Sequence, residues 1–236
     1  MRAAVIVAGG SGERFGREGG KQLAPVAGLP LVGHTLRAFE HCESVDAIVL
    51  VCHPDRIDEY RRAVVECGGA IKVVATVAGG ATRRLSVAAG LAALPAGCSS
   101  IAVHDGARAF VDPATITGAF DALDGDRSLD GVVVGHPAYD TIKEVDSSGH
   151  VKGTPDRSRL WIAQTPQVFR ADALMRAHAR AEADGFEGTD DASLVERDGG
   201  TVRMIEGPRW NLKVTVPEDL TVLGVLLARR GEEERA

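Results

Sequence analysis

The chain has 236 residues, of which 44% are hydrophobic, a composition typical of a soluble globular protein. Its 27 Lys and Arg side chains against 33 Asp and Glu give a net charge of −6 at pH 7, which argues against a nucleic-acid partner. No apolar run approaches the roughly 20 residues that span a bilayer, and the amino terminus lacks a secretion signal, so we expect a cytoplasmic protein without a membrane partner. Four cysteines without a CxxC pair predict neither disulfides nor a zinc site.

Short apolar runs alternate with helical patterns along the first 135 residues. Strands are predicted at 3–8, 47–52, 71–77, 100–104 and 131–135. Helices are predicted at 31–42, 55–67, 85–94 and 113–123. Because the strands are continuously apolar, we expect an α/β fold with a mostly parallel sheet and helices on both faces. Ligands of such sheets bind at the carboxyl ends of the strands, which points to the loops 9–21, 76–84 and 105–112.

The alternation breaks after Gly135. Two strand-like pieces, 141–145 and 150–153, flank a Ser-Ser-Gly turn and predict a β-hairpin. A two-stranded ribbon is only marginally stable alone in water, so we expect this arm, at about 137–157, to pack on a second subunit. The remaining patterns predict strands at 160–163 and 201–206 and helices at 172–183, 191–197 and from 217 onward. The whole chain, 1–236, is therefore predicted to form a single domain.

The loop after the first strand has the composition of a phosphate-binding loop. It reads GGSGERFG from Gly9 to Gly16, and Lys21 follows. Glycines let backbone N–H groups encircle an anion, and a nearby cation offsets the charge. The dinucleotide fingerprint does not fit, because Phe15 stands where its third glycine belongs. The P-loop pattern does not fit either, since Gln22 rather than Ser or Thr follows the lysine.

Two further loops lie at the same predicted edge of the sheet. Asp105 follows the fourth strand, where one carboxylate together with substrate phosphate oxygens suits Mg²⁺, although capping of its own loop is an equally open alternative. His104 continues an apolar strand, and we expect it to be structural. The segment GGATRRLS, from Gly79 to Ser86, opens a helix, and its glycines can bind an anion or expose carbonyls to a base. A plain loop-to-helix cap is the simpler interpretation there.

Other polar clusters lie outside the predicted core. The segment from Thr189 to Ser193 (TDDAS) is predicted to cap a helix rather than to act in catalysis. The segment from Gln164 to Gln167 is predicted to be an extended turn whose amides can bond the backbone or a ligand, and the backbone is the simpler interpretation. Further polar clusters lie at 140–143, at 157 and at 211–215.

The chain resembles the 2-C-methyl-D-erythritol 4-phosphate cytidylyltransferase family in an ordered set of motifs from residue 3 to about 226. These are AGGSGERFG, GKQL, GGATRRLSVAAGL, VHDGAR, DTIKEV, RSRLWIAQTPQVF, GTDDASLVE and NLKVTVPEDL. The resemblance implies a Rossmann-like nucleotidyltransferase fold and a homodimer formed through a projecting β-arm. It also implies Mg²⁺ or another divalent cation, and transfer of a cytidylyl group from CTP to a sugar-alcohol phosphate of the non-mevalonate isoprenoid pathway.

The resemblance assigns a role to each matching position. Nucleotide contacts fall on Ala8, Gly9, Gly10, Ser11, Gly12, Gly80, Ser86, Asp105 and Gly106. Catalytic cations fall on Arg14, Lys21 and Lys213, and the metal falls on Asp105. Contacts to the second substrate fall on Arg108, Thr141, Arg157 and Thr189, with Thr141 and Arg157 supplied by the other subunit.

Two positions depart from the family pattern. Ala81 stands where an acidic residue often follows the paired glycines, which leaves backbone carbonyls and Ser86 as the expected readers of cytosine. Ala109 replaces the usual proline, and we expect only a change in loop stiffness.

Three alternatives remain open. One is cytidylyl transfer to another polyol phosphate, such as ribitol 5-phosphate. Another is a nicotinamide-dependent oxidoreductase, opposed by the missing third glycine and by Cys52-His53-Pro54, where an acidic residue should close the second strand. The last is a non-catalytic sugar-nucleotide binding module.

Overall fold

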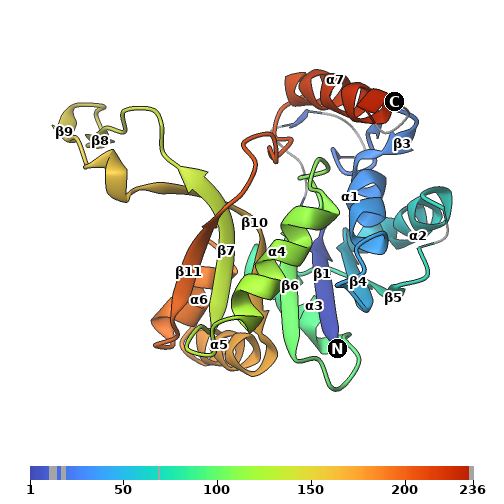
Figure 1. Cartoon of the computed structure of the whole chain (residues 1–236), viewed down its shortest axis with the longest axis horizontal. Coiled ribbons are helices and arrows are strands. Elements are labelled where there is room, and N and C mark those ends of the chain that lie inside the picture. The colour runs from blue at the N-terminus through green and yellow to red at the C-terminus, as the bar shows by residue number, and fades with distance from the viewer. Residues whose placement is uncertain (11–14, 17–19, 69, 234–236) are drawn as a thin grey trace.

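A seven-stranded sheet forms the centre of the molecule (Figure 1). The computed structural model describes residues 1–10, 15–16, 20–68 and 70–233. In spatial order the strands are β11 (Val202–Glu206), β7 (Gly131–Pro137), β10 (Trp161–Arg170), β6 (Ser100–Asp105), β1 (Arg2–Val7), β4 (Ala47–Cys52) and β5 (Val73–Ala78). Every pairing is parallel except those of β10, which runs antiparallel to both neighbours. The predicted mostly parallel sheet is confirmed.

Helices cover both faces of this sheet, as predicted. The core on one face lies under α1 (Leu31–Glu40), α2 (Ile57–Glu66) and α4 (Pro113–Asp124). The core on the other face lies under α3 (Arg83–Ala92), α5 (Ala171–Ala183) and α6 (Asp191–Arg197). Fully buried Phe39 and Phe120 fill the first core, and Val87 and Leu174 fill the second. The predicted boundaries of these helices differ from the observed ones by no more than about two residues.

Smaller elements complete the fold. The last helix, α7 (Glu218–Glu233), packs through Leu223 in a third apolar cluster with Phe15 and Val26. A small hairpin of β2 (Pro25–Val26) and β3 (Leu29–Pro30), which the sequence patterns did not indicate, lies beside it. Single 3-10 turns occur at Pro54–Arg56 and Arg157–Arg159. No described helix combines the length and the hydropathy that a membrane span requires.

The antiparallel strand β10 is longer than the sequence predicts. The predicted strand stopped at Ala163 and a turn followed, whereas the strand continues to Arg170. Proline within an apolar run normally marks an edge strand or a bulge, and Pro166 lies at a bulge, where the register shifts between Ala163 and Gln167. The prediction of a turn was wrong because Val168, on the far side of the bulge, is fully buried and pairs with both neighbouring strands.

The predicted hairpin after β7 is present, with shorter strands. β8 (Glu144–Val145) and β9 (Val151–Gly153) pair antiparallel and form a sheet of their own, separate from the central one. Figure 1 shows this hairpin at the end of a segment that extends away from the body of the molecule. Val145 and Val151 are more than half exposed. Packing of the hairpin on a second subunit stays a prediction.

Candidate functional site

A pocket of about 840 Å³ opens at the carboxyl ends of β1, β4, β5 and β6. This volume lies within the usual range for small-molecule sites. Seven of the residues predicted from the sequence line it together: Gly9, Gly10, Lys21, Gly80, Ser86, Asp105 and Lys213. Residues as far apart in the sequence as Val7 and Thr215 therefore line one pocket. They meet there because the carboxyl ends of parallel strands lie at the same edge of the sheet.

Asp105, the last residue of β6, is surrounded by three cations. Its Oδ2 lies 2.7 Å from Lys213 Nζ and 3.8 Å from Arg108 Nε, and its Oδ1 lies 3.6 Å from Arg83 Nε. Burial alone would raise the pKa of this carboxyl, but the positive charges of Lys213, Arg83 and Arg108 outweigh it and hold the pKa well below its ordinary value. Asp105 is therefore a fixed negative charge within a positively charged wall.

The two lysines predicted to be catalytic, Lys21 and Lys213, are connected by the short segment 211–215. Lys21 Nζ donates to the backbone carbonyl of Val214 at 2.9 Å, next to Lys213. The Val214 N–H donates to the carbonyl of Ala107 at 2.9 Å, which ties the segment to the loop after β6. Lys21 and Lys213, 192 residues apart in the sequence, therefore face the same pocket.

Asn211 anchors the start of that segment. It is fully buried, and its Nδ2 donates to the carbonyl of Thr165 at 2.8 Å and to Gln164 Oε1 at 3.2 Å. Arg108 Nη1 donates to the Asn211 carbonyl at 2.8 Å. The bulge of β10 thus positions the segment that carries Lys213, a role that the sequence did not indicate for the Gln164–Gln167 amides.

The loop before α3 requires both of its glycines. A Cβ at Gly79 would lie 2.8 Å from Ser86 Oγ, and a Cβ at Gly80 would collide with Leu85 Cβ. The Ser86 hydroxyl donates to the Thr82 carbonyl at 2.9 Å and accepts from the Gly80 N–H at 3.1 Å. Ser86 therefore holds the loop in shape, and its predicted contact to a base stays a prediction.

His104 is structural, as predicted. It is fully buried, and burial lowers its pKa to about 3, so the ring is neutral. Its Nε2 lies 3.3 Å from the Arg108 carbonyl, which can only accept, so Nδ1 accepts from the Thr165 hydroxyl at 3.1 Å. That hydroxyl oxygen accepts in turn from the Asp105 N–H at 3.0 Å. The ring therefore fixes the turn that presents Asp105.

This buried histidine should make stability depend on pH. The unfolded chain binds a proton near the ordinary pKa of 6.5 and the folded one only near 3, so acidification favours unfolding. We expect His104 to remove on the order of 3 kcal/mol of unfolding free energy between pH 6.5 and pH 4. His104→Gln should flatten that slope in urea unfolding measured across this range. Parallel slopes for wild type and His104→Gln would contradict the assignment.

The other predicted site residues lie elsewhere. Ala8, Gly106 and Arg108 adjoin the pocket without lining it: the Gly106 N–H donates to Val7, and Arg108 contacts Asp105. Thr141 and Arg157 are exposed on the segment that bears the hairpin, and Thr189 is exposed before α6. Three predicted residues lie outside the described ones: Ser11, Gly12 and Arg14.

The predicted cap of α6 is confirmed, with one addition. Asp190 and Ser193 form a reciprocal capping box, in which Asp190 Oδ1 accepts from the Ser193 N–H at 3.0 Å. The neighbouring Asp191 is fully buried and instead pairs with Arg83, which lines the pocket. Sequence analysis missed Arg83. The available signal was an arginine in the first turn of a helix, where the helix dipole disfavours a cation.

The residues present fit a magnesium ion that is held by one carboxylate and mainly by the phosphate oxygens of a bound substrate. Among the residues that the structure describes, no three His, Cys, Asp or Glu side chains form a metal cluster. Mg²⁺ is commonly held by one or two carboxylates, with phosphate oxygens and water completing its shell. Asp105 is a single ionised carboxylate that lines the pocket beside Lys21 and Lys213, which satisfies this requirement.

Comparisons with known proteins agree on one family. The family model described as 2-C-methyl-D-erythritol 4-phosphate cytidylyltransferase matches residues 2–229. A protein of this name from Symbiobacterium thermophilum is 44% identical over 97% of this chain and 94% of its own length. Another, from Pelotomaculum thermopropionicum, is 42% identical over 97% and 95%.

Solved structures give the same result. The enzyme of this name from Thermus thermophilus matches with a TM-score of 0.74 at 30% identity, covering 96% of this chain and 98% of its own. The 4-diphosphocytidyl-2C-methyl-D-erythritol synthase of Anaerococcus prevotii matches with a TM-score of 0.83 at 27% identity, covering 97% and 98%. The chain belongs to the 2-C-methyl-D-erythritol 4-phosphate cytidylyltransferase family.

Proposed function

We propose that this pocket transfers the cytidylyl group of CTP to 2-C-methyl-D-erythritol 4-phosphate, giving 4-diphosphocytidyl-2-C-methyl-D-erythritol and pyrophosphate. Family membership supports the reaction, which belongs to the non-mevalonate isoprenoid pathway. The observation that carries the proposal for the site is the convergence of Lys21, Lys213 and Asp105 in one pocket beside two glycine loops.

The chemistry needs positioned cations rather than a general base. The acceptor is a phosphate monoester with a second pKa of about 6, so it is mostly dianionic and nucleophilic at pH 7. The difficulty is to bring two anions together and to stabilise the charge that develops on the α-phosphate as pyrophosphate leaves. Lys21 and Lys213 supply positive charge held in place before the substrates arrive.

Nucleotide binding is assigned to the two glycine loops. Gly9 and Gly10 present backbone at the end of β1, where the phosphates would bind. The loop at Gly79 and Gly80 would receive the cytosine and read it with backbone groups, because Ala81 offers no polar side chain. Ser86 would support recognition of the base indirectly, because it holds the loop in shape.

Asp105 is the residue that would hold Mg²⁺, together with phosphate oxygens of the nucleotide. The ion, when bound, offsets phosphate charge and favours departure of pyrophosphate. Asp105 Oδ2 is now paired with Lys213, whose side chain is 40% exposed and lines the pocket in which a phosphate would bind. Lys213 would then exchange one anionic partner for another as the nucleotide binds.

The acceptor site is assigned to residues around the hairpin of a second subunit. Arg157 and Thr141 lie exposed on that segment, and Arg157 Nη1 donates to the Tyr139 carbonyl at 2.7 Å, which fixes the guanidinium near the base of the arm. Val145 and Val151 expose apolar surface on the ribbon, which favours burial against a partner. The proposed enzyme is therefore a homodimer whose sites combine residues of both subunits, with Arg108 and Thr189 contributing from the body.

Arg157→Ala should weaken binding of methylerythritol phosphate with little effect on CTP binding. The loss removes a charge-assisted contact to the acceptor phosphate, and such contacts contribute roughly 1.5–3 kcal/mol, so affinity should fall about tenfold or more. Isothermal titration with each substrate measures this directly. Unchanged affinity for the acceptor would contradict the arm contact.

Mixing the Arg157→Ala and Lys213→Ala proteins tests whether the arm acts on the partner's site. If it does, half of the subunits pair as mixed dimers with one intact site each, and about a quarter of wild-type activity should return at low acceptor concentration. No recovery would mean that Arg157 serves its own subunit.

Pyrophosphate release from CTP is the direct test of the reaction. The purified protein with Mg²⁺ should release pyrophosphate with methylerythritol phosphate as acceptor, and much less with ribitol 5-phosphate at the same concentration. Equal or greater release with ribitol 5-phosphate would reassign the acceptor, and no release with either would reject the function. Omitting the metal in a parallel reaction tests the proposed metal dependence.

A cytoplasmic location is proposed from the thiols and the substrate. All four cysteines are free, and three are buried, which is usual in reducing compartments. CTP, the proposed donor, is a cytoplasmic metabolite.

A further inference from the structure

Helix α3 begins with two arginines at the end where a cation is unfavourable. Thr82 caps the helix by accepting from the Leu85 N–H at 3.2 Å, and Arg83 and Arg84 follow in the first turn. The positive end of the helix dipole lies there, so acidic residues are the favoured occupants. Each arginine therefore needs a specific anionic partner.

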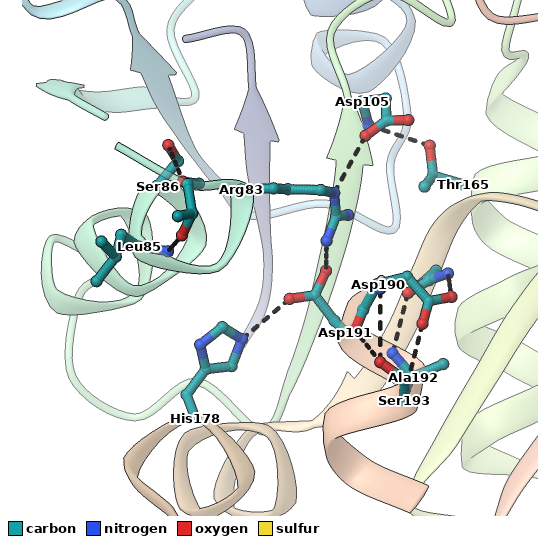
Figure 2. A network of polar contacts seen from close by, with 12 residues as sticks. Arg83, Leu85, Ser86, Asp105, Thr165, His178, Asp190, Asp191, Ala192 and Ser193 are labelled. Carbon is teal, nitrogen blue, oxygen red and sulfur yellow. Dashed lines mark hydrogen bonds and ion pairs between the residues drawn. The ribbon is translucent and has the colours of Figure 1, made fainter. Parts of the chain in front are cut away.

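The two arginines find partners in the same segment but point to different places. Arg84 Nε donates to Glu187 Oε1 at 2.8 Å, and Arg84 does not line the pocket. Arg83 Nη1 donates to Asp191 Oδ2 at 2.6 Å, while its Nε faces Asp105 Oδ1 at 3.6 Å. Figure 2 shows the Arg83 guanidinium between these two carboxylates, one below it and one above. Of these two arginines, Arg83 is the one that connects the interior with the pocket.

Asp191 is fixed in the interior by burial and by its polar partners. It is fully buried, and its second oxygen, Oδ1, lies 2.9 Å from Nε2 of His178, which is also buried. Burial alone would raise the pKa of Asp191, but Arg83 and His178 outweigh it and lower the pKa. A carboxylate in this position has no access to water, so releasing the guanidinium would leave an uncompensated buried charge.

We propose that Arg83 is a positioning residue that sets the orientation of the Asp105 carboxylate. Its guanidinium is clamped at Nη1 by the buried Asp191 and presents Nε to Asp105 Oδ1. The functional consequence rests on the proposed role of Asp105 in the reaction. A lysine at 83 would keep the charge, but its single ammonium lacks the rigid fork that faces two carboxylates at once.

This arrangement gives the two oxygens of Asp105 different roles. Oδ1 faces Arg83, which is 28% exposed and anchored to the interior. Oδ2 lies 2.7 Å from Nζ of Lys213, whose side chain is more exposed, and 3.8 Å from Arg108 Nε. By fixing Oδ1, Arg83 also fixes the direction in which Oδ2 faces the pocket, where it would meet a metal ion.

Arg83→Lys and Asp191→Asn test the proposal, with Arg84→Lys as the matched control from the same helical turn. Crystal structures should show the Asp105 carboxylate rotated in Arg83→Lys and unchanged in Arg84→Lys. Replacing a residue that holds a metal ligand in place typically lowers metal affinity by about 10–100-fold. In Arg83→Lys, Mn²⁺ binding to the CTP-loaded protein, measured by electron paramagnetic resonance without acceptor, should therefore weaken about tenfold. In turnover, kcat should fall while KM for the acceptor stays unchanged.

The outcomes separate this proposal from the proposed function. An Asp105 carboxylate that keeps its orientation in Arg83→Lys overturns the positioning role, whether or not the protein is active. Equal losses in Arg83→Lys and Arg84→Lys also overturn it, because they would show that both arginines merely fasten α3 to the segment before α6. Wild-type protein that orients Asp105 through Arg83 but forms no product would instead reject the function alone. If Asp191→Asn does not fold, as thermal unfolding would reveal, Arg83→Lys decides, since it keeps a charge opposite Asp191.

Discussion

Replacing Lys213 by alanine is expected to lower kcat by about 10²–10³, the range observed when one preorganised donor that stabilises developing charge is removed. Lys213 Nζ lies 2.7 Å from Asp105 and beside the segment that accepts from Lys21, so its charge is already held in the pocket. The substitution removes a cation from the place where the α-phosphate would gain charge. Steady-state pyrophosphate release at saturating CTP and acceptor measures the change.

A matched ion pair elsewhere separates this effect from lost stability. Arg176 Nε also lies 2.7 Å from a largely buried carboxylate, that of Asp198. Arg176 lies on α5, however, and does not line the pocket. Arg176→Ala should therefore lower the melting temperature without lowering kcat. Near-normal turnover of Lys213→Ala under the same conditions would reject the catalytic assignment.

Lys21→Ala is expected to reduce kcat by a similar factor of about 10²–10³. Lys21 reaches the pocket from the amino-terminal loop and donates to the Val214 carbonyl, so the substitution removes positive charge and frees that carbonyl. The Val214 carbonyl oxygen, which carries a partial negative charge, would then face an incoming phosphate and repel it. Single-turnover measurements with preformed enzyme–CTP complex report on the chemical step separately from binding.

Lys72 provides the control for this prediction. Its Nζ also donates to a backbone carbonyl, that of Cys42 at 2.8 Å, but it does not line the pocket. Lys72→Ala should leave the single-turnover rate unchanged. A comparable loss in both variants would attribute the effect of Lys21→Ala to general destabilisation.

Much of the fold could be predicted because its signals are local. The apolar runs of β1, β4 and β6 are fully or almost fully buried, as continuous apolar strands in a parallel sheet should be. Strand β10 could not be delimited, because its bulge at Pro166 resembles a turn until the pairing partners on both sides are known. Pairing across a sheet is a long-range property that single-chain periodicity does not contain.

The candidate site shows the same division. Residues that carry a charge or a glycine at the end of a strand, such as Lys21, Asp105 and Gly80, could be selected from type and position. Arg83 and Asn211 could not, because the partners that hold them, Asp191 for Arg83 and Thr165 for Asn211, lie 108 and 46 residues away in the sequence. Their side chains act on other side chains, and composition does not reveal such pairs.

The Lys21–Val214 link has a consequence for the timing of synthesis. A chain made from its amino terminus completes β1, its glycine loop and Lys21 early, yet the carbonyl that receives the lysine is made only near the end. Until residue 214 leaves the ribosome, Asp105 lacks its ion pair with Lys213 and can contact Arg83 and Arg108. A nascent chain released before that point would hold most of the sheet but would lack a working centre, so incomplete translation products should be inert rather than partially active.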